Sequence, residues 1–114
     1  MVRLKLHENL SQGPTGGSEL SDETFATTDE ARAWCDANGY GWATMPPAEA
    51  RELWESGDLL DHTIAGNVIN VLGGVRKPDC EDGILMDPPD AERLWGIPGF
   101  AAAARRRMID QSCR

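Results

Sequence analysis

The sequence has few of the residues that form covalent crosslinks or metal sites. Its 114 residues include three cysteines and two histidines, which are Cys35, Cys80, Cys113, His7 and His62. An odd number of widely spaced cysteines does not suit a disulfide framework, and no pair has the close spacing of a structural zinc site. The cysteines therefore favour a reducing, cytoplasmic compartment, and we expect neither a metal nor another cofactor.

Long hydrophobic runs are also missing. No apolar segment approaches the roughly 20 residues that a helix needs to span a bilayer. The first ten residues, MVRLKLHENL, lack an apolar stretch of signal-peptide length. The sequence therefore predicts a soluble protein that does not enter a membrane.

Positive charge is scarce over most of the chain. Residues 1–104 carry 7 Lys and Arg against 18 Asp and Glu, and residues 105–114 carry four arginines against one aspartate. The formal net charge is −8. Such an acidic body repels nucleic acids and anionic membranes and favours a basic partner surface. The alternative is that the charge only keeps a small protein soluble.

The remaining composition is that of a folded domain. Hydrophobic residues make up 40% of the chain and include four tryptophans, which suffices for a core without disulfides or metal. We expect residues 1–114 to form a single compact domain. Within it, residues 11–23 are rich in glycine, serine and acidic residues and predict a flexible loop.

Two stretches of the sequence resemble one another. GWATMPPAEARELW begins at Gly41, and GILMDPPDAERLW begins at Gly83. Each has an apolar segment that is too short for a helix and suits a strand. The prolines that follow cannot donate to a sheet, but they fit the first turn of a helix. The pattern predicts strand, proline and helix twice, either as two equivalent packing units or as two similar local solutions.

These segments define the expected fold. Residues 2–7 alternate apolar and polar side chains, as a half-buried strand does. With residues 41–45 and 83–87 they predict a small sheet of about three strands, packed by three or four short amphipathic helices. The fold class is therefore α+β. Because helical sequence separates 41–45 from 83–87, these two strands are candidates for parallel neighbours.

Two further segments predict helices. Thr27 and Glu30 have the spacing of a capping box, and Asn38-Gly39 provides a stop signal. Residues 60–72 place apolar side chains at helical spacing, although Gly66 and several β-branched residues also allow a strand. We favour a helix for residues 60–72.

Acidic residues concentrate after the first Pro-Pro pair. Five of them occur within 13 residues, and only Arg51 offsets them. They are Glu49, Glu52, Glu55, Asp58 and Asp61. Their spacing turns them away from the apolar stripe of the predicted helix, so we expect an exposed acidic surface that contacts a partner. An ordinary solvated helix face is the alternative. Catalysis by paired carboxylates would require companion groups that the sequence lacks.

The function predicted from these features is that of a small, non-enzymatic protein-binding domain. It would occupy a basic site on another protein and contact neither nucleic acid nor membrane directly. Inhibitors, immunity proteins and anti-restriction or anti-CRISPR proteins of bacterial mobile elements and phages share this profile of size and charge, and some act by mimicking nucleic acid.

Two alternatives remain open from the sequence. One is a small enzyme or metabolite-binding domain, with His62 or Cys80 in a pocket beside Asp79 and Glu81. No nucleophile–base or metal motif supports it. The other is a subunit of a larger assembly that contacts its neighbours through exposed tryptophans.

Overall fold

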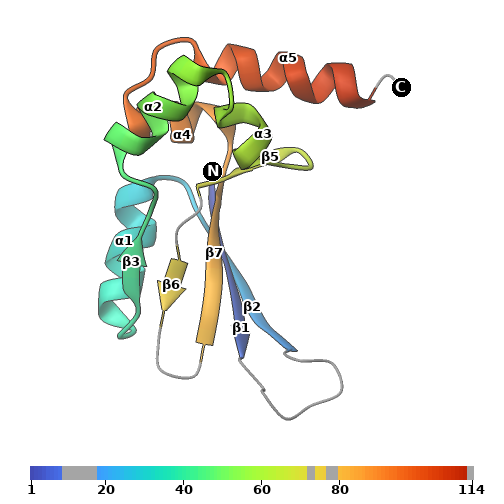
Figure 1. Ribbon diagram of the computed structural model, residues 1–114. Coiled ribbons are helices and arrows are strands. Elements are labelled where there is room, and N and C mark those ends of the chain that lie inside the picture. The colour runs from blue at the N-terminus through green and yellow to red at the C-terminus, as the bar shows by residue number, and fades with distance from the viewer. Residues whose placement is uncertain (9–17, 72–73, 77–79, 113–114) are drawn as a thin grey trace.

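A computed structural model describes residues 1–8, 18–71, 74–76 and 80–112 (Figure 1). These residues form seven strands and five helices, which confirms the α+β class, although there are more strands and helices than expected. The strands are β1 (Val2–Glu8), β2 (Ser18–Phe25), β3 (Gly41–Ala43), β4 (Ile64–Ala65), β5 (Val68–Asn70), β6 (Gly74–Arg76) and β7 (Cys80–Met86). The helices are α1 (Thr28–Ala37), α2 (Pro47–Ser56), α3 (Leu59–Thr63), α4 (Pro88–Trp95) and α5 (Phe100–Ser112).

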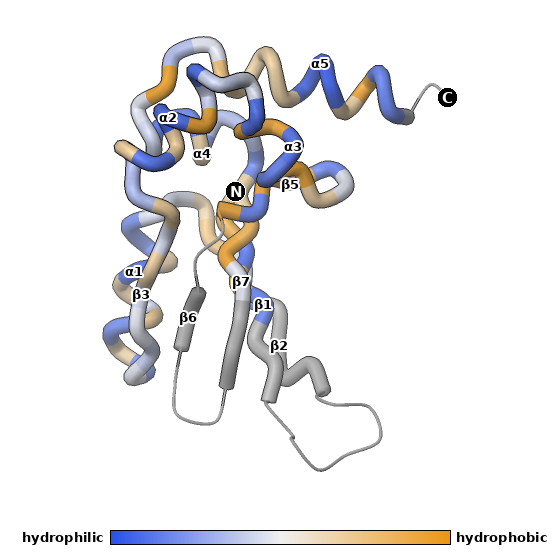
Figure 2. The backbone as a smooth tube through the Cα atoms, in the orientation of Figure 1, coloured by the Kyte–Doolittle hydropathy of each residue, from blue (hydrophilic) through white to orange (hydrophobic). Residues whose placement is uncertain are grey.

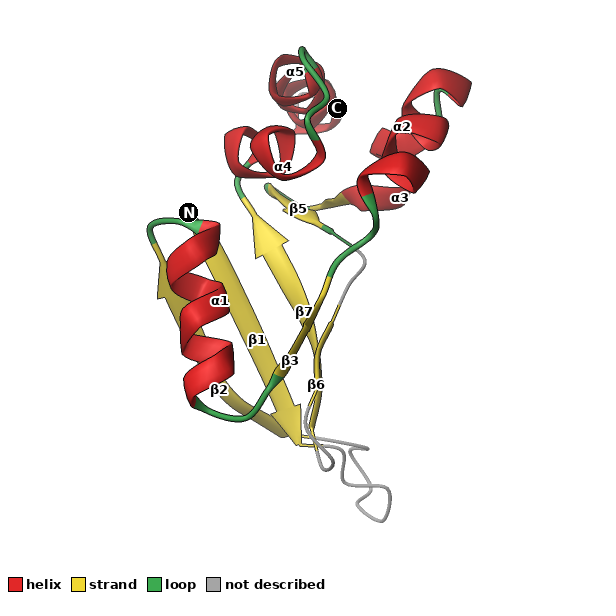
Figure 3. Ribbon diagram, turned by 90° about the vertical axis from the view of Figure 1, so that its left-hand side faces the viewer, coloured by secondary structure: helices red, strands yellow, loops and turns green. Residues whose placement is uncertain are grey.

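The main sheet has five strands in the order β2-β1-β7-β5-β4, and every neighbouring pair is antiparallel. β1 has the predicted alternation, because Val2 and Leu4 are fully buried while Lys5 is exposed. β3 and β6 form a separate antiparallel pair. The helices α2, α3, α4 and α5 gather at one end of the main sheet, whereas α1 lies along β1 and β2 (Figures 1 and 3). None of the helices within the described ranges is long and apolar enough to cross a bilayer.

The two similar stretches do form strand, proline and helix in turn, but their strands are not neighbours. β3 pairs with β6, and β7 pairs with β1 on one side and β5 on the other. A parallel pairing of 41–45 with 83–87 is therefore wrong. Leu85 and Met86 of β7 have antiparallel partners on both sides, so no edge remains there for a parallel neighbour.

The helix predicted after Thr27 is confirmed as α1. The Thr27 Oγ1 atom accepts a hydrogen bond from the Glu30 backbone N–H at 3.2 Å, and the Glu30 carboxylate accepts from the Ala26 N–H at 3.1 Å. The first bond satisfies a donor that the first helical turn leaves free, and the second satisfies the N–H of the residue before the N-cap. Ala31 and Cys35 are fully buried on the face of α1 that packs against the sheet.

The loop predicted for residues 11–23 needs a correction in its second part. Residues 11–17 lie outside the described residues. Residues 18–23 belong to β2, which pairs with β1 from Ser18 opposite Glu8 to Phe25 opposite Val2. Backbone hydrogen bonds to β1 form this edge strand, and such bonds do not depend on the apolar content from which we predicted the loop.

The helix predicted for residues 60–72 is correct only at its start. α3 ends at Thr63, and residues 64–70 form the β4–β5 hairpin instead. A two-residue turn at Gly66-Asn67 joins the strands, and Gly66 has a φ of +66°, a backbone conformation that glycine adopts readily. Ile69 is fully buried opposite Met86 of β7. The pairing of β5 with β7 therefore overrides the helical spacing.

The core lies between the sheet and the helices. In Figure 2, hydrophobic residues gather along β5 and in the adjoining part of β7. The largest fully buried side chains there come from both sheet strands and helices. They are Trp95, Phe100, Leu4, Leu59, Ile69, Ile84, Met86, Val2 and Val71.

The helices of the two similar stretches meet at one aromatic residue of α5. The Phe100 ring packs edge-on against Trp54 of α2 and Trp95 of α4, with ring centroids 5.9 and 5.4 Å apart. The Trp95 indole N–H donates to the Met45 carbonyl oxygen at 3.0 Å. Since Met45 precedes α2, this bond ties the second stretch to the first. The two stretches therefore pack against each other through α5.

Candidate functional site

The five predicted carboxylates lie on α2, on α3 and on the short turn between them. Glu49, Glu52 and Glu55 are spaced by three on α2, Asp58 precedes α3, and Asp61 lies within it. All five side chains are exposed, whereas Ala50 of α2 is fully buried. Side chains spaced by three share one side of a helix. We call this set of five carboxylates the acidic face.

The acidic face is only partly neutralised by neighbouring groups. Asp61 forms an ion pair with Arg107 of α5, and the Asp58 carboxylate accepts a hydrogen bond from the Ser56 hydroxyl at 3.2 Å. Among the described side chains, no other member of the acidic face forms an ion pair. The surface therefore keeps a negative potential that a cationic partner can meet.

The structure does not bring His62 and Cys80 together. His62 is an exposed residue of α3, close to the end of β7 where Met86 pairs with Ile69. Cys80 begins β7 at its other end, opposite Glu8. A strand of this length spans roughly 20 Å. Asp79 lies outside the described residues, and Glu81 follows Cys80 at the distant end of the strand.

Cys35 is not placed or ionised as a nucleophile would be. It is fully buried on α1. Burial, together with the nearby charge of Asp36, raises the pKa of the Cys35 thiol to about 11. Reactive cysteines have lowered pKa values, so this thiol stays protonated and acts as a small apolar side chain of the core.

Within the ranges that the structure describes, no three His, Cys, Asp or Glu side chains come close enough together to hold a metal ion. His62 of α3 lies next to Asp61 in the sequence, and its backbone N–H donates to the Asp58 carbonyl oxygen at 3.2 Å. The exposed carboxylates of the acidic face offer negative charge to a cationic group.

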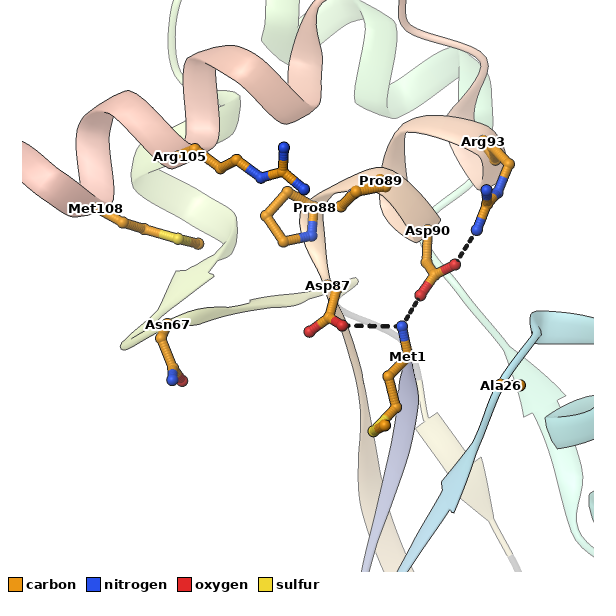
Figure 4. Close-up of a pocket in the computed structure, with 10 residues that line it drawn as sticks. All are labelled: Met1, Ala26, Asn67, Asp87, Pro88, Pro89, Asp90, Arg93, Arg105 and Met108. Atoms are coloured by element: carbon orange, nitrogen blue, oxygen red, sulfur yellow. Dashed lines mark hydrogen bonds and ion pairs between the residues drawn. The ribbon is translucent and has the colours of Figure 1, made fainter.

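Sequence reasoning missed a charged cluster around the first residue. The Met1 α-ammonium group forms ion pairs with Asp87, at 2.9 Å, and with Asp90, and Arg93 forms an ion pair with the other oxygen of Asp90 (Figure 4). Asp90 is only 3% exposed. We call these four residues the amine cluster. They line one side of a surface pocket of about 390 Å³ that also contains Arg105.

The amine cluster is assembled by the pairing of β1 with β7. Val2 lies opposite Met86, so Met1 meets Asp87, whose backbone N–H donates to the Met1 carbonyl oxygen at 3.0 Å. Asp90 matches Glu49 in the sequence of the other stretch, yet Glu49 is exposed. No spacing in the sequence distinguishes the two, because the difference comes from the neighbouring strand.

The amine cluster is better suited to holding the fold than to binding an anion. Its ammonium group and Arg93 are already paired with carboxylates. Helix N-termini bind anions through free N–H groups, but Pro88 and Pro89 have none to offer at the start of α4.

The amine cluster predicts a loss of stability in alkaline solution. Burial favours the neutral amine, but hydrogen bonds and charges of Asp90 and Asp87 outweigh it, so the pKa of the Met1 α-amino group is raised above its usual value of 8.0. Its contribution to stability is present in full below pH 8 and is lost as the pH rises through the raised folded-state pKa. We expect the free energy of unfolding, measured with urea, to fall across this range.

The matched control carries Asp87→Asn and Asp90→Asn, which remove both carboxylates and leave every other titrating group in place. Mass spectrometry first verifies that Met1 is retained. The unmodified protein should lose more stability between pH 8 and pH 10 than the control does. Equal losses would show that the amine cluster does not contribute.

Comparisons with protein-family models, with curated proteins and with solved structures give no significant match to this chain.

Proposed function

We propose that this protein is a small, acidic, non-enzymatic protein-binding domain that occupies a basic site on a partner protein. The observation that carries this proposal is the acidic face, where five exposed carboxylates project from adjacent helices and one of them has a described cationic partner. Charges of one sign on one surface steer a partner of opposite charge and select it over others.

The packing of the helices supports this role. Ala50 of α2 is fully buried, and Leu53 and Trp54 of the same helix pack against the core, so the core holds the helix that carries most of the acidic face in place. A pre-organised backbone lowers the entropic cost of binding. The acidic face also gathers several negative charges on one surface, as a nucleic acid backbone does. Inhibitors and immunity-type proteins that block a basic, phosphate-binding site use such mimicry, and we place this protein in that functional class.

The same charges indicate which kind of partner the protein binds. An acidic surface repels nucleic acids and anionic membranes, so the partner is a protein and the contact is direct. Of the three consecutive arginines of α5, Arg107 is paired with Asp61, which reduces the positive charge that α5 presents. Its widely spaced cysteines do not suit a disulfide framework, so we place the protein in the reducing cytoplasm. The functional class named above is typical of bacteria and phages.

Charge reversal on the acidic face is expected to abolish partner binding. The immobilised protein is exposed to bacterial lysate at low salt, and the proteins that high salt releases are identified and purified. Glu52→Lys, Glu55→Lys and Asp58→Lys, combined in one variant, should weaken the affinity for such a partner by about 100-fold or more, because each lysine adds repulsion where an attraction is lost. Isothermal titration calorimetry measures the change.

A second variant separates the acidic face from net charge. Asp29, Asp36 and Asp110 are exposed on α1 and α5, and changing all three to lysine alters the net charge by the same amount. This control should bind within about threefold of the unmodified protein, apart from long-range steering. If both variants bind alike, the acidic face is not the contact surface.

A further inference from the structure

A small apolar pocket lies beside the acidic face. It has a volume of about 200 Å³ and is lined by residues of α2, α3 and α5 and of the turn between α2 and α3. These are Trp54, Gly57, Leu59, Leu60 and Ala103. Leu59 is almost fully buried, whereas the Trp54, Leu60 and Ala103 side chains are half-buried and accessible from outside. We call this cavity the anchor pocket.

Carboxylates of the acidic face adjoin the anchor pocket along the chain. Glu55 follows Trp54, Asp58 lies between Gly57 and Leu59, and Asp61 follows Leu60. All three carboxylates are exposed. None of the three lines the pocket, but each is a chain neighbour of a lining residue, so negative charge lies close to the apolar hollow.

The remaining charge near the anchor pocket comes from α5. Arg106 and Arg107 both lie about one turn beyond Ala103, and Arg107 is paired with Asp61. This pair neutralises one carboxylate, so Glu55 and Asp58 are the members of the acidic face here that can meet an incoming positive charge. The apolar pocket and the nearby carboxylates together determine which kind of partner segment can bind.

The size of the anchor pocket favours a protein side chain over a metabolite as its occupant. Sites for small molecules usually measure about 300–1,000 Å³ and enclose most of the ligand. At about 200 Å³ the anchor pocket is smaller and opens to the surface. Protein interfaces commonly place one large apolar or aromatic side chain in a pocket of this kind, at the centre of a polar rim.

We propose that the anchor pocket receives one large apolar or aromatic side chain of the partner, from a segment in which Lys or Arg residues flank that side chain. This assignment rests on the proposed function, because the flanking cations are those that meet the acidic face. The apolar side chain contacts Trp54, Leu60 and Ala103, and the cations contact Glu55 and Asp58. Charge complementarity brings the segment in, and the pocket selects among basic segments.

Two fluorescently labelled peptides test the proposal, Gly-Lys-Lys-Trp-Lys-Lys-Gly and its counterpart with Ala in place of Trp. Fluorescence anisotropy at low and high salt measures their binding. We expect the Trp peptide to bind at least about tenfold more tightly than the Ala peptide, in line with the contribution of an interface anchor. Binding of both peptides should weaken in high salt.

A matched pair of substitutions on α5 localises the effect. Ala103→Leu fills the pocket, whereas Ala102→Leu adds the same side chain at an exposed neighbouring position outside it. Ala103→Leu should remove the tenfold preference for the Trp peptide, and Ala102→Leu should leave it unchanged. A second readout needs no substitution in α5. In NMR spectra of the unmodified protein, the Trp peptide should shift the indole N–H resonance of Trp54, which the Trp54→Phe variant identifies.

The outcomes separate this proposal from the proposed function. If both peptides bind alike, with salt sensitivity but without the Trp54 shift, the anchor pocket is overturned and the acidic face stands. Another outcome is that neither peptide binds in low salt, while the charge-reversed variant still loses a lysate partner that the unmodified protein binds. In that case the anchor pocket is overturned and the proposed function stands. If the Trp peptide binds equally in low and high salt, the assignment of a basic segment is wrong.

Discussion

Replacing Trp95 with alanine is expected to lower the free energy of unfolding by about 3–5 kcal/mol. The Trp95 side chain is 1% exposed and packs edge-on against Phe100, with ring centroids 5.4 Å apart. Its indole N–H also donates to the Met45 carbonyl oxygen. The substitution leaves a cavity where α4, α5 and the segment before α2 meet, and it leaves that carbonyl without its donor. Urea unfolding followed by circular dichroism measures the loss.

The other similar stretch supplies the control. Trp54 has the same place in its stretch and the same aromatic partner, at 5.9 Å, but it is half-buried. Trp54→Ala should therefore cost about 1–2 kcal/mol, in proportion to the smaller area that it returns to water. Trp95→Phe keeps most of the apolar packing and removes the donor, so it should fall between the two. Equal losses for Trp54→Ala and Trp95→Ala would contradict the packing described above.

The second large effect is expected at Asp90. Asp90→Asn should reduce the free energy of unfolding by about 1.5–3 kcal/mol, the range for hydrogen bonds to charged groups. The side chain is almost fully buried and joins the Met1 ammonium group to Arg93, so an uncharged amide weakens both contacts at once. The partners can turn to water, because the Arg93 side chain is 71% exposed, and this keeps the cost below that of a buried unpaired charge.

Asp87→Asn is the matched control, since it removes the same charge from the same ammonium group. The Asp87 side chain is 43% exposed, so water screens its ion pair, and its loss should cost less than about 1 kcal/mol. Chemical unfolding at pH 7 compares the two variants. If Asp87→Asn proved as costly as Asp90→Asn, burial would not be what makes the amine cluster stabilising.

Local sequence signals predicted α1, α2, α4 and the best-patterned strand. α1 begins at its capping box, α2 and α4 begin at their prolines, and both of those helices end at a glycine. β1 covers residues 2–7, for which the alternation predicted a strand. In each case a few neighbouring residues determine the backbone conformation, so the pattern can be read without knowing what packs against it.

The missed strands depend on residues far away in the sequence. β2 forms because β1 offers an edge to residues whose composition favours a loop, and β5 forms because β7 offers another. The two similar stretches make the same point, since nearly the same local sequence places β3 and β7 in different sheets. Strand pairing is a non-local property that local propensity does not encode.

The candidate sites also divide into those that local sequence predicts and those that depend on distant residues. The exposure of Glu49, Glu52 and Glu55 follows from their spacing on one helix, and the sequence predicted it. The anchor pocket forms only where α5 comes back beside α2 and α3, and the amine cluster forms only where β1 meets the end of β7. Those contacts join residues more than 40 positions apart, which no spacing rule covers.

The position of β1 also determines when the fold can be completed during synthesis. β1 lies between β2 and β7, so one of its neighbours is available early and the other only after residues 80–86 have been made. A chain emerging from the ribosome presents its N-terminal part first. Until β7 arrives, β1 has an open edge to which the strand of another nascent chain can add. Completion of the sheet is therefore a late event, and it covers the backbone edge of β1 against neighbouring chains.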